Sequence, residues 1–296
     1  MPVLSTYLKG ILITALGVLV ISPDGLLTQL ITTDHWTLIF WRALFMAFGM
    51  WMLSAFIYPK NTWAKYKALG SSGIAMVALY SLGSISFIVA ITHTSVANTL
   101  IILSTTPLWA VLIGRIFLGE RIAARSWSAI ALVCIGVIVI STDKSSANTS
   151  LFGDIAALIG AFFLAAGFTI VRRFPSIPIF PALSTSGLLM ALLMLPFAQP
   201  FSISQQDFGY LIIMGLYMVP VGTALMFLGP RYIPAAEVGL MLLLESILGP
   251  IWVWLVLSEH PGTQSFIGGG IILSTLVINA VWVMRSTKPA VIKEPV

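Results

Sequence analysis

The sequence has little charge and almost no cysteine. Only 8% of its 296 residues are charged, against roughly a quarter in soluble domains, so polar groups are too few to coat a water-exposed surface. The single cysteine, Cys134, excludes an internal disulfide framework and a zinc site built from several cysteines. Hydrophobic residues make up 58% of the chain and its mean hydropathy is +1.03. This composition is that of an integral membrane protein.

The sequence also lacks the short motifs of several common enzyme classes. It has no G-x-x-x-x-G-K-[ST] phosphate loop, which argues against ATP hydrolysis as an energy source. It has neither H-E-x-x-H nor G-x-S-x-G, the usual metalloprotease and serine-hydrolase signatures. We therefore expect no catalytic residues, metal or cofactor. An intramembrane enzyme that uses the carboxylates of Asp24 and Glu245 is a further alternative.

Long apolar runs recur along the chain. A helix needs about 20 mostly apolar residues to cross a bilayer core. The sequence contains ten such runs, at residues 8–30, 35–57, 69–91, 96–118, 124–140, 152–171, 180–198, 208–229, 235–257 and 264–284. Because the connections are too short for a soluble domain, we predict an all-α integral membrane protein of ten transmembrane helices that functions within the bilayer.

The basic residues divide unequally between the two sides of these spans. With the N-terminus inside, 13 of the 15 lysines and arginines fall in inner segments, Lys144 is outside, and Arg42 lies within the second span. Positive charge on the cytoplasmic side sets membrane topology. We therefore expect a multi-pass protein of the plasma (inner) membrane with both termini in the cytoplasm. The high pI of about 9.5 then reflects topology, and the partner it implies is the lipid bilayer rather than nucleic acid.

The chain contains a weak internal repeat. A shift of 139 residues aligns the last three spans of each half, and a shift of 143 aligns their first spans. The matched pairs are Gly70 with Gly209, Ala97 with Ala236, Leu103 with Leu242, Glu120 with Glu259, Gly10 with Gly153, and Gly17 with Gly160. Chance similarity between apolar helices is the competing interpretation. We expect a five-helix unit at 1–143, a second at 152–285 and a cytoplasmic tail at 286–296.

Five spans per half is an odd number, so the second unit is inverted relative to the first. Inverted repeats with a binding site near the midplane are a recurring plan of secondary transporters, in which the same cavity opens to either side in turn. A channel is a further alternative, although channels usually form a pore between several chains.

Two opposite charges fall at the same depth in consecutive spans. Asp24 and Arg42 each lie about 9–10 Å below the outer boundary at 1.5 Å per residue, which predicts an ion pair. Charges within spans are costly and usually face a cavity or a partner. The functional hypothesis is that Arg42 holds a substrate carboxylate with Asp24 as its competitor or gate. The alternative is a structural pair that never meets substrate.

Glu245 lies near the midplane in the ninth span, about 15 Å from the inner end. No lysine or arginine is predicted at its depth. We interpret it as a proton-coupling or substrate-contact residue, or alternatively as a protonated acid hydrogen-bonded to a neighbouring helix.

Other polar and aromatic groups suggest the lining of a cavity for a small amphipathic molecule. Packing or lipid exposure is as good an explanation for each residue singly. The candidates are Tyr80 and Ser84 in the third span, Asn98 with Ser104 and Thr105 near Trp109 in the fourth, and Tyr217 with Thr223 in the eighth.

Prolines and glycines mark candidate hinges. Pro23 and Gly25 flank Asp24, so the first span is expected to be bent or partly unwound there. Pro107, Pro220 and Pro250 offer similar bends in the fourth, eighth and ninth spans, although prolines are also common in ordinary membrane helices.

Several short motifs resemble a known family. Leu118-Gly119-Glu120-Arg121 and Ser104-Thr105-Thr106-Pro107-Leu108 look like the EamA-type drug/metabolite transporter superfamily. Ser22-Pro23-Asp24-Gly25 and Phe40-Trp41-Arg42 look like its YddG-type branch, the aromatic amino acid exporters. The ninth span often carries Leu-Glu-Pro in that family, whereas Leu244-Glu245-Ser246 lacks the proline and Pro250 follows one turn later, so a kink here is expected to be displaced.

The resemblance implies export of aromatic and other neutral amino acids, and related small metabolites, by alternating access. A multidrug or cationic-compound exporter is the alternative, in which Asp24 and Glu245 would contact the cation. Gly268-Gly269-Gly270 in the tenth span permits close helix approach, either within the monomer or in a homodimer.

Overall fold

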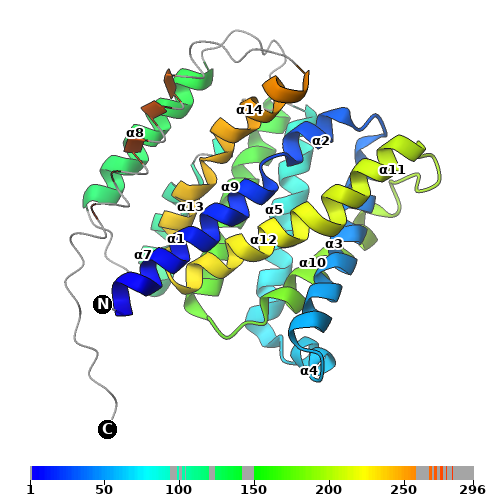
Figure 1. Cartoon of the computed structure of the whole chain (residues 1–296), viewed down its shortest axis with the longest axis horizontal. Helices are drawn as coiled ribbons and strands as arrows, with labels where there is room; N and C mark the ends of the chain where they lie inside the picture. The colour runs from blue at the N-terminus through cyan, green and yellow to red at the C-terminus, as the bar shows by residue number, and fades with distance from the viewer. Residues whose placement is uncertain are drawn as a thin grey trace.

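The computed structural model describes residues 2–93, 99, 102–103, 105–119, 124–141 and 150–257, with eight further positions between 267 and 282. Every regular element in this part of the chain is a helix (Figure 1). In chain order these are α1 Pro2–Ile21, α2 Asp24–Leu30, α3 His35–Ile57, α4 Thr62–Lys67, α5 Gly70–His93, α7 Thr106–Leu118, α8 Ala124–Ser141, α9 Leu151–Arg173, α10 Ile179–Met194, α11 Gln205–Ile212, η1 Ile213–Met218, α12 Val219–Leu228, η2 Gly229–Arg231, α13 Ala235–Leu242 and α14 Glu245–Leu257.

The helices confirm the predicted all-helical membrane architecture. Five described stretches are long and apolar enough to cross a membrane: Thr6–Thr28, His35–Ile57, Gly70–His93, Leu151–Arg173 and Gln205–Arg231. They coincide with the first, second, third, sixth and eighth predicted spans. Shorter apolar helices fall within the fourth, fifth, seventh and ninth, and most of the tenth lies outside the described residues. The short helix α4, between the second and third spans, was not predicted.

The first span is interrupted at the predicted place. α1 ends at Ile21 and α2 begins at Asp24, with Ser22 and Pro23 between them. Proline lacks the N–H that would bond the carbonyl four residues earlier, so the helix cannot continue unchanged. The expected break near Pro23 is therefore confirmed, whereas Gly25 lies within the regular helix α2.

The ninth span is also interrupted, but not at Pro250. α14 runs from Glu245 to Leu257, so the helix is not interrupted at Pro250. The break lies at Leu243 and Leu244, whose N–H groups bond the carbonyls only three residues earlier. Such tightened bonds end one helix before the next begins.

The two halves interlock through reciprocal helix pairs. α1 of the first half crosses α12 of the second, where a Cβ added at Gly17 would lie 2.8 Å from the Gly222 carbonyl oxygen. α9 of the second half crosses α5 of the first, where a Cβ added at Gly160 would lie 3.5 Å from the Gly83 carbonyl oxygen. Figure 1 shows α1 beside α12 in the front of the bundle. At Gly17 the close approach requires a residue without a side chain, whereas the distance at Gly160 is an ordinary contact.

This reciprocity follows the spacing of the sequence repeat. Gly17 and Gly160 are 143 residues apart, and Gly83 and Gly222 are 139 apart. The first span of each half therefore packs on the third span of the other half, at equivalent glycines. The second spans pack together as well: Gly187 of α10 meets the backbone of Ala43 and Ala47 of α3.

The fourth and ninth spans meet at their interruptions. α7 begins at Thr106 and α14 begins at Glu245, positions that are 139 residues apart. A Cβ added at Gly239 of α13 would lie 3.2 Å from Pro107 of α7. The two helix breaks thus lie at equivalent positions in the two halves, and both border the interior of the bundle.

Candidate functional site

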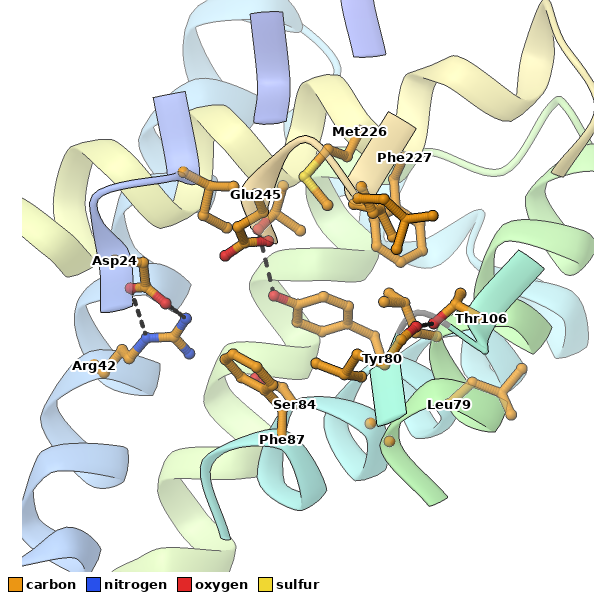
Figure 2. Close-up of a pocket in the computed structure, with 18 residues that line it drawn as sticks. Asp24, Arg42, Leu79, Tyr80, Ser84, Phe87, Thr106, Met226, Phe227 and Glu245 are labelled. Atoms are coloured by element: carbon orange, nitrogen blue, oxygen red, sulfur yellow. Dashed lines mark hydrogen bonds and ion pairs between the residues drawn. The ribbon is translucent and has the colours of Figure 1, made fainter. Parts of the chain in front are cut away.

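A cavity of about 860 Å³ lies among the interrupted helices (Figure 2). This volume includes space that is open to solvent, so the enclosed part of the cavity is smaller. Of the sequence-predicted residues, the structure places Asp24, Arg42, Tyr80, Ser84, Thr223 and Glu245 on its wall.

Asp24 and Arg42 form the predicted ion pair on this wall. Arg42 Nη2 donates to Asp24 Oδ2 at 2.8 Å, and Arg42 Nε to Asp24 Oδ1 at 3.4 Å. Their side chains are only 6% and 5% exposed. α3 brings Arg42 to the cavity, and the break after Ile21 places Asp24 in the first turn of α2. No described residue accepts a hydrogen bond from Arg42 Nη1, so this edge of the guanidinium is available to a ligand carboxylate.

Glu245 lies on the wall of the same cavity, at the first position of α14. Figure 2 shows its side chain near the end of the cavity that holds Asp24 and Arg42. No lysine or arginine was predicted at the depth of Glu245, but Arg42 borders the same cavity. Its carboxylate makes no hydrogen bond or direct ion pair with another described residue, so it is open to a ligand.

Tyr80 of α5 crosses the middle of the cavity. Its hydroxyl lies 3.4 Å from Thr223 Oγ1 on α12, and its ring packs edge-on against Phe227 at 5.4 Å between centroids. Ser84, one turn further along α5, lines the same wall. The Tyr80–Thr223 contact links the two halves at the cavity.

The rest of the wall is largely apolar and was not predicted. Among its residues are Ile21, Phe87, Leu103, Leu164, Met226 and Leu242. The sequence repeat could have indicated several of them, because the cavity wall contains pairs of residues that occupy equivalent positions in the two halves. These pairs are Ile21 with Leu164, Ser84 with Thr223, Phe87 with Met226, Leu103 with Leu242, and Thr106 with Glu245. The cavity thus lies where the two repeats face each other.

Three predicted lining residues lie elsewhere. Thr105, directly before α7, donates its hydroxyl to the Ile102 carbonyl at 2.7 Å and does not line the cavity. Tyr217 is 59% exposed on η1. It is six residues from Thr223, which is about one and two-thirds helical turns, so the two side chains cannot share a face. Trp109 is half-buried against Phe162 of α9, with ring centroids 5.5 Å apart, and does not line the cavity. Asn98 and Ser104 lie outside the described residues.

The remaining candidate hinges differ in setting. Pro107 is in the first turn of α7, where its missing N–H has no helical partner. Pro220 lies inside the continuous helical stretch from Gln205 to Leu228, directly after the π-helical segment η1. Within the described residues, no group of three or more His, Cys, Asp or Glu side chains could hold a metal ion.

The fold and the cavity define a class of protein: a multi-pass membrane protein whose two repeated halves border a common cavity, the architecture of secondary transporters. The model of the EamA-like transporter family matches residues 8–142 and again residues 151–281. The chain therefore belongs to the EamA-like transporter family.

Individual relatives are distant. An uncharacterized transporter of Methanothermobacter thermautotrophicus is 22% identical over 217 residues, covering 69% of this chain and 63% of its own length. The pseudopaline exporter CntI of Pseudomonas aeruginosa is 23% identical over 216 residues, covering 70% of this chain and 75% of its own. A protein of known crystal structure has the same fold, with a TM-score of 0.79 at 14% identity, over 96% of this chain and 99% of the other.

Proposed function

We propose that this protein is a secondary transporter that exports aromatic and other neutral amino acids, and related small metabolites, by alternating access. The observation that carries the proposal is the composition of the cavity wall. The Arg42 guanidinium and the Glu245 carboxylate border the same space as Phe87, Met226 and Phe227. An amino acid would place its carboxylate on Arg42, its ammonium group on Glu245 and its side chain against the apolar wall.

The direction and location of transport are part of this proposal. Export is supported by the relative named as an exporter, and by the resemblance of the first two spans to the aromatic amino acid exporters. The distribution of basic residues supports the inner membrane with both termini in the cytoplasm. The family supports solute movement without chemical alteration, so we propose no enzymatic activity.

A second candidate is an exporter of cationic compounds. It is favoured by one observation: the cavity carries two carboxylates, Asp24 and Glu245, but only one guanidinium. In that case a cationic drug would bind the carboxylates, and Arg42 would serve only as the partner of Asp24.

The test is transport by purified protein in liposomes. Uptake of labelled phenylalanine or tryptophan, measured with and without a pH gradient, is expected to saturate and to show counterflow. Conductance without saturation would indicate a channel, and a chemically altered product would indicate an enzyme.

Substitution at Arg42 separates the two transport candidates. Arg42→Lys keeps the positive charge but loses the planar fork that suits a carboxylate. An amino acid exporter is expected to lose substrate binding in this variant while it still folds. Binding equal to the wild type, together with loss of cation transport in Glu245→Gln, would favour the cation exporter.

A further inference from the structure

The break in the first span leaves the Leu19 carbonyl without its helical partner. In an uninterrupted helix the Leu19 carbonyl would accept from the N–H of residue 23, but Pro23 has none. The Ser22 hydroxyl replaces it and donates to the Leu19 carbonyl at 2.9 Å. Ser22 is 2% exposed, so this local bond is sealed inside the protein.

A residue of the ninth span completes this arrangement. Trp252 of α14 donates its indole N–H to the Ser22 hydroxyl oxygen at 2.7 Å. The hydrogen bonds therefore run in series from Trp252 to Ser22 to Leu19, and α14 is bonded directly to the break. The Ser22 hydroxyl thus uses its single donor and one of its two acceptor lone pairs, and loss of either neighbour removes one of these bonds.

Trp252 also shares its helix with Glu245. The two are seven residues apart on α14, which is nearly two turns, so their side chains leave the same face. At one end of this face Glu245 lines the cavity. At the other end Trp252 is bonded to Ser22 in the break of the first span, and Asp24, two residues after Ser22, lines the same cavity. The bond between Trp252 and Ser22 thus connects the helices that carry the two cavity carboxylates.

We propose that Trp252 is a positioning residue that fixes α14 on the break of the first span and thereby sets the spacing of Asp24 and Glu245 that the substrate meets. This inference rests on the proposed transport function for its effect on substrate affinity. Its positional part stands on the hydrogen bonds alone.

The transport experiment compares Trp252→Phe, Ser22→Ala and the double variant in proteoliposomes with labelled phenylalanine. Each single variant is expected to raise KM about three- to tenfold, as loss of one hydrogen bond would, with Vmax within about twofold. The double variant is expected to be no worse than Ser22→Ala alone, because Ser22→Ala already removes the bond to Trp252 along with the bond to Leu19. A KM that does not change, or a change confined to Vmax, would overturn the proposal.

A matched control is available in Trp41. Its indole N–H also donates to a single oxygen, the Pro200 carbonyl at 3.1 Å, but the residue does not line the cavity. Trp41→Phe therefore removes the same kind of bond elsewhere and is expected to leave KM unchanged. A rise in KM equal to that of Trp252→Phe would assign the effect to general loosening of the bundle and overturn the proposal.

A second measurement does not depend on transport. Gly25 lies in α2, and a Cβ there would meet no atom within 4 Å, so Gly25→Cys is tolerated. In a Cys134→Ala background, the rate at which a soluble thiol reagent modifies this position reports where α2 lies. Trp252→Phe is expected to change the rate at least threefold, and Trp41→Phe to leave it unchanged.

The two measurements separate the two proposals. If the wild-type protein transports no phenylalanine, the proposed function fails and the thiol rate alone decides the positional claim. If the rate is unchanged in Trp252→Phe, the positional claim is wrong whatever the protein transports.

Discussion

The first spans of the two halves occupy equivalent places but differ in continuity and charge. The first half has α1 and α2, separated at Ser22 and Pro23, whereas the second half has the uninterrupted helix α9. At the spacing that pairs Gly17 with Gly160, Pro23 corresponds to Ala166 and Asp24 to Gly167. The same scaffold position therefore carries a break and a carboxylate in one half and neither in the other.

The fourth and ninth spans, by contrast, share the position of their break and differ in the residue that follows it. Both are interrupted at the same register, yet the residue that follows the break is Thr106 in one and Glu245 in the other. Helix packing in this protein is therefore nearly two-fold symmetric, whereas the distribution of charge on the cavity wall is not. A substrate with distinct charged ends can be oriented by such a wall.

The largest expected effect comes from breaking the ion pair between Asp24 and Arg42. Asp24→Ala leaves the Arg42 guanidinium buried without its partner, which is expected to lower the free energy of unfolding by about 3–5 kcal/mol. Adding Arg42→Met to this variant is expected to recover much of the loss. Unfolding in mixed detergent micelles measures both. A double variant as unstable as the single one would show that the pair is not the source of the loss.

The next largest effect is expected on substrate binding, when Glu245 and the equivalent residue Thr106 are substituted. Glu245→Gln removes the charge that we assign to the substrate ammonium group and is expected to weaken phenylalanine binding about tenfold to a hundredfold. Thr106→Val, at the equivalent position of the first half, is expected to change binding less than threefold. Equilibrium binding of labelled phenylalanine measures both. Unchanged counterflow in Glu245→Gln would also eliminate an obligatory proton step at this residue.

A smaller effect distinguishes the two glycine crossings. A Cβ at Gly17 would lie 2.8 Å from a backbone oxygen, whereas the nearest atom to a Cβ at Gly160 lies at 3.5 Å, an ordinary contact. Gly17→Ala is therefore expected to cost about 1–3 kcal/mol of stability through overpacking, and Gly160→Ala less than about 1 kcal/mol. Thermal unfolding in detergent gives the order. Equal costs would mean that the two crossings are equally tight.

The smallest effect concerns the entry to the second spans. Asp34 caps α3 by accepting from the N–H groups of Trp36 and Thr37, whereas α10 begins after Pro178 without a side-chain cap. Asp34→Ala is expected to cost about 1 kcal/mol. Stability measured at neutral pH gives this value, with Ser202→Ala in the exposed loop as a control expected to cost less.

The same cap predicts a dependence on pH. Desolvation acts to raise the pKa of the Asp34 carboxyl, but hydrogen bonds from Thr37 and Trp36 and the charge of His35 outweigh it and hold the pKa below its ordinary value. Because the pKa is lower in the folded state, the stabilisation is complete above about pH 4 and is lost as the pH falls through the folded-state value. The stability difference between wild type and Asp34→Ala is therefore expected to shrink at about pH 3. A difference that grows on acidification would contradict this assignment.

Much of the fold was predictable because its determinants are local. Long apolar runs set the spans, and the bounds predicted for the second span agree with α3. Pro23 predicted the first break because the missing N–H is a property of that residue alone. Asp24 and Arg42 could be paired because both lie close to one turn region, where errors in counting depth are small.

The rest depended on contacts between distant parts of the chain. The place of Glu245 on the same cavity wall as Arg42 was not predicted, because no proline marks the break at Leu243 and Leu244 in the sequence. Tyr217 was assigned to the cavity by residue type, although the spacing from Thr223 places it on another face. The Trp252–Ser22 bond joins residues 230 positions apart, and nothing in the local sequence of either indicates it.

The reciprocal crossings have a consequence for how the protein is made. The contact between Gly17 and Gly222 cannot form until Gly222 is synthesised, about 205 residues after Gly17. At about 5–20 residues per second this delay is roughly 10–40 s. During that interval the nascent first segment, with its proline and its acidic residue, lies in the lipid without its permanent neighbour. Biogenesis of this protein therefore calls for either a tolerant translocon or an insertion chaperone that shields the early segment until the later one arrives.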